Sequence, residues 1–265
     1  MKSIPDPAHY NKLYKEGYMS GFTDIYEYCR VKTVMSMLNH LKTKNPPKRI
    51  LDIGCGQGRY ITISKNFFND SEFIGVDFSE VALAKAKENH PDTQFFLGTA
   101  EDLHMIPEES IDLIISIELF EHVYDFRKTI RECSKVLKPS GRILFTTPCA
   151  NKFSLEWLEN YLSKQIKRTD DGYNLFGTDP YEHLRRLTSN DVKTTFSECG
   201  LTIDQIRYRA HLFTRISYRS SQALNRRFNK NIAPKFFAEM AFLDWRLFRL
   251  LPNGATMIGV ARRSV

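Results

Sequence analysis

The chain has 265 residues, of which 42% are hydrophobic and 26% charged, and its formal net charge is +7. This is a globular balance with enough apolar surface to bury a core. The five scattered cysteines lack zinc-ligand spacing, no apolar run reaches membrane-spanning length, and MKSIPDPAHY lacks a signal-peptide core. We therefore expect reduced thiols, no metal, no transmembrane helix and a cytoplasmic location.

The N-terminal part of the chain predicts helices. Apolar residues recur at helical spacing over 23–44, and the prolines of NPPK at 45–48 end that pattern. For the preceding stretch HYNKLYKEGY there are two interpretations. It is an amphipathic helix packed at the edge of the fold, or it folds over a ligand and contacts it through Tyr10 or Tyr14.

Strand and helix patterns then alternate. Strands are predicted at 49–54, 72–78, 93–98, 111–117 and 141–148, with helices at 58–69, 79–90 and 125–138. Such alternation indicates an α/β fold with a doubly wound, mostly parallel, Rossmann-like sheet. Ligand-facing loops are then expected at the carboxyl ends of the strands.

Beyond residue 150 the alternation loosens. A helix and a long loop are expected over 151–180, followed by a helix at 188–200, a strand at 201–209, amphipathic stretches at 212–228 and 235–251, and a last strand at 255–263. We therefore expect a seven-stranded sheet in one domain. Its parts are an N-terminal helical cover (1–45), a core (48–210), a helical cap inserted before the last strand (211–252) and that strand (254–263).

The glycine-rich stretch ILDIGCGQGRY (50–60) joins the first predicted strand to a helix. Gly54 permits a tight turn, and Gly56 lets a ligand approach the backbone where a Cβ would stand. The dinucleotide fingerprint requires a further glycine where Arg59 stands, and the phosphate loop GxxxxGK[ST] is absent. The motif therefore argues against a dinucleotide and against ATP, and a plain glycine-rich turn between strand and helix is the structural alternative to a ligand site.

An acidic residue ends the second predicted strand in FIGVDFSE. Asp77 lies 23 residues after Gly54, a spacing typical of a carboxylate that accepts ribose hydroxyls. The alternative is that Asp77 caps the following helix. Ser79 stands at a better position for that cap.

Taken together, the motifs DIGCGQG, GVDFSE, GTAEDL, IDLIISIELFEHV, KVLKPSGRILFTTP and HLRRLTSNDV resemble the class I S-adenosylmethionine-dependent methyltransferases. The resemblance is to the small-molecule group that includes quinone-biosynthesis enzymes, and it covers roughly residues 48–210. It implies S-adenosylmethionine as cofactor. It further implies cofactor contacts from the following residues: Asp52, Gly54, Cys55, Gly56, Asp77, Phe78, Thr99, Ala100, Glu101, Ser116 and Ile117.

Two histidines are candidate catalytic residues. His122 follows the fourth strand in ELFEHV, and His183 lies in YEHLRRLT, so both are expected near the carboxyl ends of the strands. Each is a candidate general base. The structural alternative is that His122 fixes its loop by a hydrogen bond and His183 packs at a helix entry. Glu118, Glu121 and Tyr181 are expected to orient these histidines or to contact the acceptor.

The C-terminal quarter carries the positive charge. Residues 201–265 hold 12 Lys+Arg and 3 Asp+Glu, a net charge of +9. Apolar residues of 235–251 form one stripe, which we interpret as a lid packed on the sheet. The alternative is an interfacial helix in peripheral contact with an anionic membrane.

These features favour a methyltransferase that acts on an oxygen or nitrogen of a small organic acceptor, with lipid-linked and sugar-containing molecules among the candidates. A non-catalytic S-adenosylmethionine-binding or partner-binding protein on the same fold is the alternative. Nucleic acid ranks lower as a partner, because ELFEHV stands where methyltransferases of base amino groups carry an Asn-Pro-Pro-Tyr-type signature. The oligomeric state stays open.

Overall fold

Strands and helices alternate in the computed structural model, which describes residues 6–17, 25–42, 45–180, 182–228 and 235–264. The helices are α1 (Pro7–Lys15), α2 (Ile25–Leu41), α3 (Arg59–Lys65), α4 (Glu80–Asn89), α5 (Phe126–Val136), α6 (Leu155–Leu162), α7 (Ser189–Glu198), α8 (Leu212–Phe228) and α9 (Lys235–Phe248). The strands are β1 (Arg49–Ile53), β2 (Glu72–Asp77), β3 (Gln94–Leu97), β4 (Ile111–Ile117), β5 (Leu137–Pro148), β6 (Ile166–Arg168), β7 (Asn174–Phe176), β8 (Leu201–Arg209) and β9 (Thr256–Arg263).

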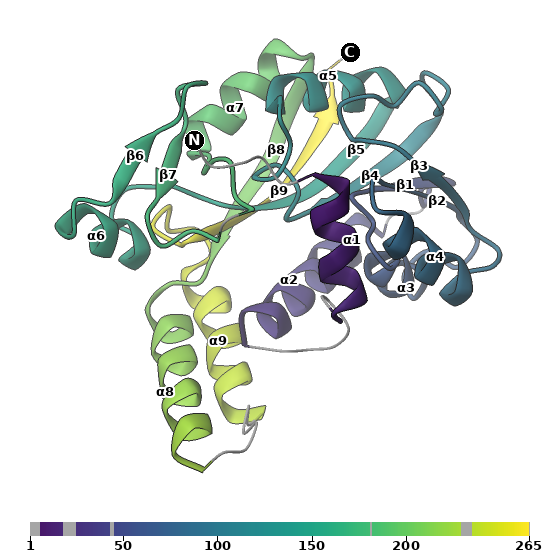
Figure 1. The fold of residues 1–265 in the computed structure, drawn as a ribbon. Coiled ribbons are helices and arrows are strands. Elements are labelled where there is room, and N and C mark those ends of the chain that lie inside the picture. The colour runs from purple at the N-terminus through teal and green to yellow at the C-terminus, as the bar shows by residue number, and fades with distance from the viewer. Residues whose placement is uncertain (1–5, 18–24, 43–44, 181, 229–234, 265) are drawn as a thin grey trace.

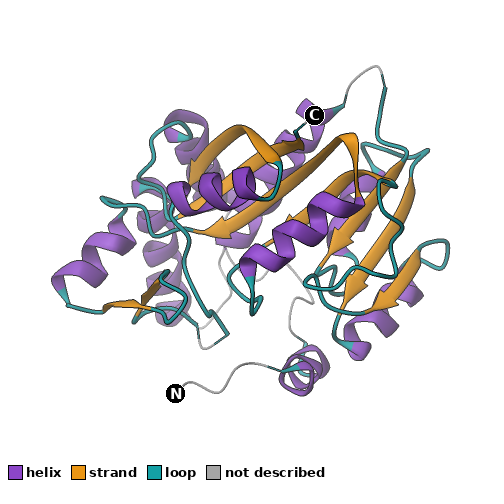
Figure 2. Cartoon of the chain, turned by 90° about the horizontal axis from the view of Figure 1, so that it is seen from above, coloured by secondary structure: helices purple, strands orange, loops and turns teal. Residues whose placement is uncertain are grey.

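The main sheet has seven strands within the described residues, in the order β3-β2-β1-β4-β5-β9-β8. All neighbouring pairs are parallel except those made by β9, which runs antiparallel to both β5 and β8. Figures 1 and 2 show helices on both faces of this twisted sheet. The predicted doubly wound α/β fold is confirmed. The strand order reverses between β1 and β4, which is where such sheets bind ligands.

Two apolar cores fill the space between sheet and helices. On one face, Ile130 of α5 and Phe196 of α7 pack against strand residues such as Phe145. On the other face, Val34 of α2 and Ile61 of α3 pack against the sheet. Because the central strands are covered on both faces, their sequences are continuous apolar runs and do not alternate between apolar and polar residues.

Capping side chains set where the helices begin. Ser79 accepts a hydrogen bond from the backbone N–H of Ala82 and caps α4, as expected. Thr188 and Asp191 form a reciprocal capping box at the start of α7. These local bonds satisfy backbone donors that have no partner inside the helix.

Two local expectations were wrong. Strand β5 begins at Leu137, not at 141, because Leu137 pairs with Ile111 ahead of a shift in register. The long loop expected in the second part of 151–180 contains the antiparallel pair β6–β7, which closes through Gly172 in the left-handed region (φ 84°). The sequence pattern missed this hairpin because each strand has only three residues.

The helices α8 and α9 form a hairpin that projects from one end of the sheet (Figure 1). It packs mainly against α2, where Ile25 and Cys29 contact Ala241 and Trp245. The expected lid on the sheet is therefore a projecting hairpin, and its predicted apolar stripe is turned to solvent at Phe236, Leu243, Leu247 and Leu250. Among the described helices, none combines the length and hydrophobicity needed to cross a bilayer.

Candidate active site

A cavity of about 310 Å³ opens at the carboxyl ends of β1, β2 and β4. Predicted site residues that line it are Gly54, Asp77, Phe78, Thr99, Ala100, Glu101, Ile117, His122 and His183. Predicted residues that lie outside its lining are Asp52, Cys55, Gly56 and Ser116. The cavity is also lined by Tyr10, Tyr14, Arg30, Tyr60, Glu118, Glu121 and Glu182, whereas no described residue of α8 or α9 reaches it.

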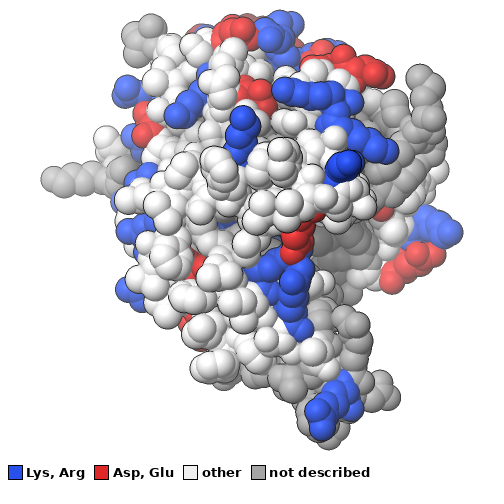
Figure 3. Space-filling model, turned by 90° about the vertical axis from the view of Figure 1, so that its left-hand side faces the viewer, with Lys and Arg blue, Asp and Glu red and all other residues white. Residues whose placement is uncertain are grey.

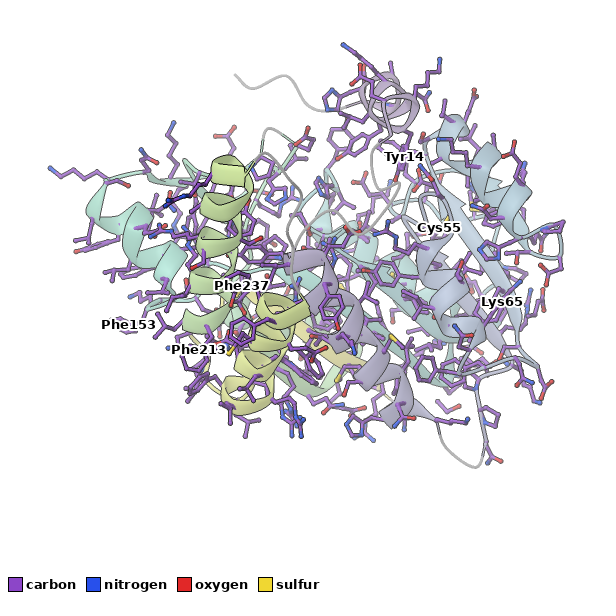
Figure 4. All side chains as sticks on the ribbon, turned by 90° about the horizontal axis from the view of Figure 1, so that it is seen from below. Tyr14, Cys55, Lys65, Phe153, Phe213 and Phe237 are labelled. Carbon is purple, nitrogen blue, oxygen red and sulfur yellow. The ribbon has the colours of Figure 1, made fainter. Side chains whose placement is uncertain are left out.

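The glycine turn after β1 has a backbone conformation that residues other than glycine rarely adopt. Gly54 and Gly56 have φ values of 68° and 52°, in the left-handed region. A Cβ on Gly54 would lie 2.8 Å from Cδ1 of Leu119, and one on Gly56 would lie 2.6 Å from the Tyr14 hydroxyl. The space that we expected a ligand to approach at Gly56 thus holds Tyr14. Figure 4 shows Tyr14 on α1 beside the turn that carries Cys55.

Asp77 ties the glycine turn to the start of α4. Its Oδ2 accepts a hydrogen bond from the N–H of Gly56 at 2.8 Å, and its Oδ1 accepts one from the N–H of Ser79 at 2.9 Å. Burial raises the pKa of this carboxyl, and the two backbone N–H groups oppose that shift. A carboxylate has about four lone-pair positions, so Asp77 retains capacity to accept hydroxyl groups of a ligand.

Two polar side chains lie buried behind the cavity wall. Within the described structure, Asp52 Oδ2 and Ser116 Oγ have no hydrogen-bond partner. Burial, and then the nearby Asp77, raises the pKa of Asp52 well above its usual value. Side chains alternate along a strand, so Ser116 points away from the cavity that its neighbour Ile117 lines.

The N-terminal helix α1 covers the cavity. The ring of Tyr10 lies 5.0 Å from the ring of Phe78, and its hydroxyl lies 2.9 Å from Nδ1 of His122. Asn11 accepts a hydrogen bond from Ser79 at 2.7 Å and so fixes the helix to the start of α4. Of the two interpretations of HYNKLYKEGY, the described residues 9–17 agree with the second, in which Tyr10 and Tyr14 fold over the site.

Glu101 lines the cavity and also holds the loop after β4. One of its carboxylate oxygens accepts hydrogen bonds from the backbone N–H groups of Tyr124 and Asp125. Asp125 is the residue that caps α5. The Glu101 carboxylate therefore fixes the part of the cavity wall that the loop after β4 forms.

His122 and His183 come together although they are 61 positions apart in the chain. Their ring centroids lie 5.0 Å apart. The segment 182–185 is bound to the loop after β4 through Leu184, whose N–H donates to the carbonyl of Glu121, and through buried Arg185. The Arg185 guanidinium donates to the backbone carbonyls of Phe120, Val123 and Tyr124. Tyr181, the remaining predicted partner, lies outside the described residues.

The groups around these histidines have shifted pKa values. Burial, and then Glu118, raises the pKa of Glu121 to about 7. Burial, and then His183, lowers the pKa of His122 to about 4, so its imidazole is neutral. Burial also opposes charge on His183, but Asp179 and Glu121 outweigh it and raise its pKa.

Sequence reasoning missed an ionic network on the cavity floor. Glu118 lies 3.3 Å from guanidinium nitrogens of both Arg30 and Arg209 and accepts a hydrogen bond from Thr146 at 2.8 Å. Burial opposes the ionised form of Glu118, but the two arginines outweigh it and lower its pKa. Glu118 also has a positive φ of 52°. The arginines come from α2 and β8, and no local motif marks them.

The fold and the cavity define an α/β protein of the Rossmann-like class. Residues 44–208 match a family model described as a methyltransferase domain, which is more than half of the chain. The chain therefore belongs to this methyltransferase family, for which S-adenosylmethionine is the cofactor.

Two curated relatives and one solved structure illustrate the family. A ubiquinone biosynthesis O-methyltransferase of Saccharophagus degradans is 31% identical, over 60% of this chain and 69% of its own length. A malonyl-[acyl-carrier protein] O-methyltransferase of Bacillus anthracis is 27% identical, over 60% of this chain and 61% of its own. Other curated relatives are matched over as little as 37% of their length. A methyltransferase solved in complex with the Haloferax volcanii Trm112 activator shares the fold, with a TM-score of 0.63, 18% identity and coverage of 99% of this chain and 100% of that one.

Proposed function

We propose that this protein transfers a methyl group from S-adenosylmethionine to a hydroxyl oxygen of a small organic acceptor. One cavity joins a glycine turn and an acidic strand end to a cluster of buried Glu121 with half-buried His122 and His183, and this observation carries the proposal. The first part suits the cofactor and the second part suits an acceptor with a proton to lose.

The side chains around the cavity suit the hydrogen-bonding and apolar groups of the cofactor. The cofactor supplies a methyl group on a positively charged sulfur, which becomes neutral on transfer. Asp77 accepts the ribose hydroxyls through its remaining lone pairs, and Phe78 lies against the adenine. Buried Asp52, with a carboxylate oxygen that no described residue donates to, holds the turn around the methionine end of the cofactor. We further assign Thr99, Ala100 and Glu101 to the adenine edge and Ile117 to the wall near the sulfur.

The acceptor side of the cavity favours oxygen over nitrogen. An alcohol or phenol must lose a proton as its oxygen is methylated, whereas an amine needs only correct positioning. Glu121, His122 and His183 place a carboxylate and two imidazoles at the cavity wall, and we assign to them the orientation of the hydroxyl and the removal of its proton. Two relatives of the chain are named O-methyltransferases, which supports the same choice.

Calorimetry followed by an acceptor screen tests the proposal. We expect S-adenosylmethionine and S-adenosylhomocysteine both to bind, and methyl transfer from a labelled donor to occur with a phenol or alcohol in the panel. If neither ligand binds, the proposal fails. If both bind and every hydroxyl acceptor is inert while amines react, the assignment to oxygen fails. Binding without any turnover over a broad panel favours a non-catalytic protein on the same fold.

We also propose that the hairpin α8–α9 lies against an anionic membrane. Its exposed stripe carries large apolar side chains, and Arg246 is exposed between Leu243 and Leu247 on the same helix. In Figure 3 the lower part of the molecule is mostly uncharged, with a few blue side chains, whereas the upper part carries charges of both signs. Part of the positive charge is balanced, because Arg215 and Arg219 pair with Glu159 of α6. The combination of apolar and basic side chains is typical of an interfacial helix.

A further inference from the structure

Glu121, His122 and His183 form a cluster of ligand-type atoms. One donor atom from each residue can be chosen so that all three lie within 4.8 Å of one another. The two imidazole planes are inclined at 79°, so the rings do not stack. All three residues line the cavity, so a ligand held by the cluster would also face the acceptor.

The hydrogen bonds of His122 orient it for binding through Nε2. Its Nδ1 lies 3.0 Å from the carbonyl oxygen of Glu182 and 2.9 Å from the Tyr10 hydroxyl. A carbonyl oxygen only accepts, so this network places the ring proton on Nδ1. The lone pair is then on Nε2, which lies 3.8 Å from Oε1 of Glu121. A ligating histidine is typically fixed in this way, by a proton donated to a carbonyl from its other nitrogen.

Glu121 presents an oxygen that lacks a donor. Its side chain is 1% exposed, and Oε2 accepts a hydrogen bond from Thr147 at 3.0 Å. Its Oε1 accepts no hydrogen bond from any described residue. A buried carboxylate oxygen in this state is costly unless a cation or a proton donor meets it.

His183 completes the set from another part of the chain. Its Nδ1 lies 3.7 Å from Oδ1 of Asp179, a carboxylate that is also bound by Arg186. This distance is too long for a hydrogen bond, and Nδ1 of His183 has no hydrogen-bond partner among the described residues, so Asp179 favours a charged imidazole but does not fix the ring. Two of the three ligands thus have a hydrogen-bonded supporting group, Thr147 for Glu121 and Glu182 for His122, and the third has a carboxylate nearby.

We propose that Glu121, His122 and His183 bind a divalent transition-metal cation, with zinc as the best fit, and leave a coordination position open for the acceptor oxygen. The proposal deepens the methyl-transfer function proposed above. Two imidazoles and one carboxylate suit zinc and neighbouring transition metals, whereas magnesium prefers oxygen ligands. Tetrahedral zinc bonds of about 2.0–2.2 Å separate the ligands by about 3.3–3.5 Å, so the side chains must rotate inward by roughly 1 Å.

A cation at this site changes how the acceptor loses its proton. Coordination lowers the pKa of a hydroxyl, so its proton passes to water and the oxygen becomes the stronger nucleophile. The new C–O bond then forms as the sulfur–methyl bond breaks, and the bond electrons stay on the sulfur. This step needs no oxidant or reductant.

Metal binding is measured on the full-length chain, with any polyhistidine tag removed and metal stripped by a chelator. We expect zinc to bind at one equivalent per chain by calorimetry, and cobalt to give the visible absorption of a nitrogen- and oxygen-ligated ion. His122→Ala, His183→Ala and the near-isosteric Glu121→Gln should each weaken binding by at least about tenfold. His104→Ala is the matched control, because His104 is exposed beside Asp102 outside the cavity.

Two results would overturn the proposal: no zinc or cobalt binding by the stripped chain, or equal affinity in the three variants and the control. Circular dichroism checks that each variant folds. If a histidine variant does not fold, the zinc affinity of Glu121→Gln tests the proposal in its place. Titration with S-adenosylhomocysteine separates the two proposals. Metal binding without S-adenosylhomocysteine binding contradicts the methyl-transfer function, and the reverse result contradicts the metal site alone.

Discussion

The hydroxyl of Tyr10 lies 2.9 Å from Nδ1 of His122, so the N-terminal helix is joined directly to the loop after β4. The two residues are 112 positions apart and meet over the cavity, where both belong to its lining. The same Nδ1 lies 3.0 Å from the carbonyl of Glu182. One imidazole therefore connects the cover α1, the β4 loop and the segment that carries His183.

Tyr10→Phe removes this connection but keeps the aromatic ring that packs on Phe78. A net hydrogen bond of about 0.5–1.5 kcal/mol is lost, so α1 should open roughly two- to tenfold more often. Hydrogen exchange of amides in 7–15 measures this opening. Tyr28→Phe, which removes a hydroxyl bound to Glu239 between α2 and α9, is the control and should leave α1 unchanged. Equal protection of α1 in wild type and Tyr10→Phe would contradict the prediction.

Asp77→Asn should weaken S-adenosylhomocysteine binding. The amide replaces one acceptor oxygen with an N–H₂ group that faces the N–H of Gly56 or Ser79, and the variant loses a charged acceptor for the ribose hydroxyls. Hydrogen bonds to a charged group contribute about 1.5–3 kcal/mol, which corresponds to roughly ten- to hundredfold in Kd. Calorimetry measures the change. Asp92→Asn, which alters an exposed carboxylate paired with Lys65, is the control. If both variants bind S-adenosylhomocysteine with the same affinity, the role of Asp77 is refuted.

Asp52→Asn should stabilise the ligand-free protein at neutral pH. Burial raises the pKa of Asp52 above its unfolded value, so its favourable contribution is fully present below about pH 4 and is lost as the pH rises through the folded pKa. The asparagine variant does not titrate. Its advantage in the free energy of unfolding should therefore grow as the pH rises from about 4 through the raised folded pKa of Asp52. Urea unfolding at several pH values checks this, and an advantage that shrinks with rising pH would show the sign to be wrong.

Glu118→Ala should cost much more stability than loss of an exposed ion pair. The substitution leaves Arg209, whose side chain is 2% exposed, without its carboxylate. Breaking a buried pair in this way costs about 3–5 kcal/mol. The matched control is Glu72→Ala, which breaks the exposed pair with Arg49 and should cost about 0–1 kcal/mol. Similar free energies of unfolding for the two variants would mean that the network on the cavity floor contributes little.

Leu247→Glu combined with Leu250→Glu should abolish binding to anionic vesicles. Both residues are exposed, Leu247 in the last turn of α9 and Leu250 just after its end, and a carboxylate there opposes both insertion and attraction to negative lipid. Sedimentation with vesicles of anionic and of neutral lipid at low salt measures binding. Leu97→Glu, exposed on the edge strand β3, controls for a general change in surface charge. If the wild-type chain does not sediment with anionic vesicles at low salt, the proposed membrane contact is ruled out.

The sequence alone determined the features that depend on neighbouring residues. All seven strands of the main sheet were predicted, and the central parallel ones were the plainest because strands buried on both faces form continuous apolar runs. The turn at Gly54 and Gly56 and the cap at Ser79 were also readable, because backbone conformation and capping act over a few residues. The position of Asp77 followed from the length of one strand–helix–strand unit.

Only the tertiary structure decided which distant side chains meet. His122 and His183 were separate candidates in the sequence, and Arg185 brings their segments together by binding three carbonyls of the β4 loop. The pairing of Glu118 with Arg30 and Arg209 likewise spans three elements without a shared motif. Periodicity identified the apolar stripe of α9 but not its surroundings. The sequence of such a stripe is the same whether the stripe packs on a sheet or faces solvent. In this structure α9 packs against α2 through its other face, so the stripe is exposed.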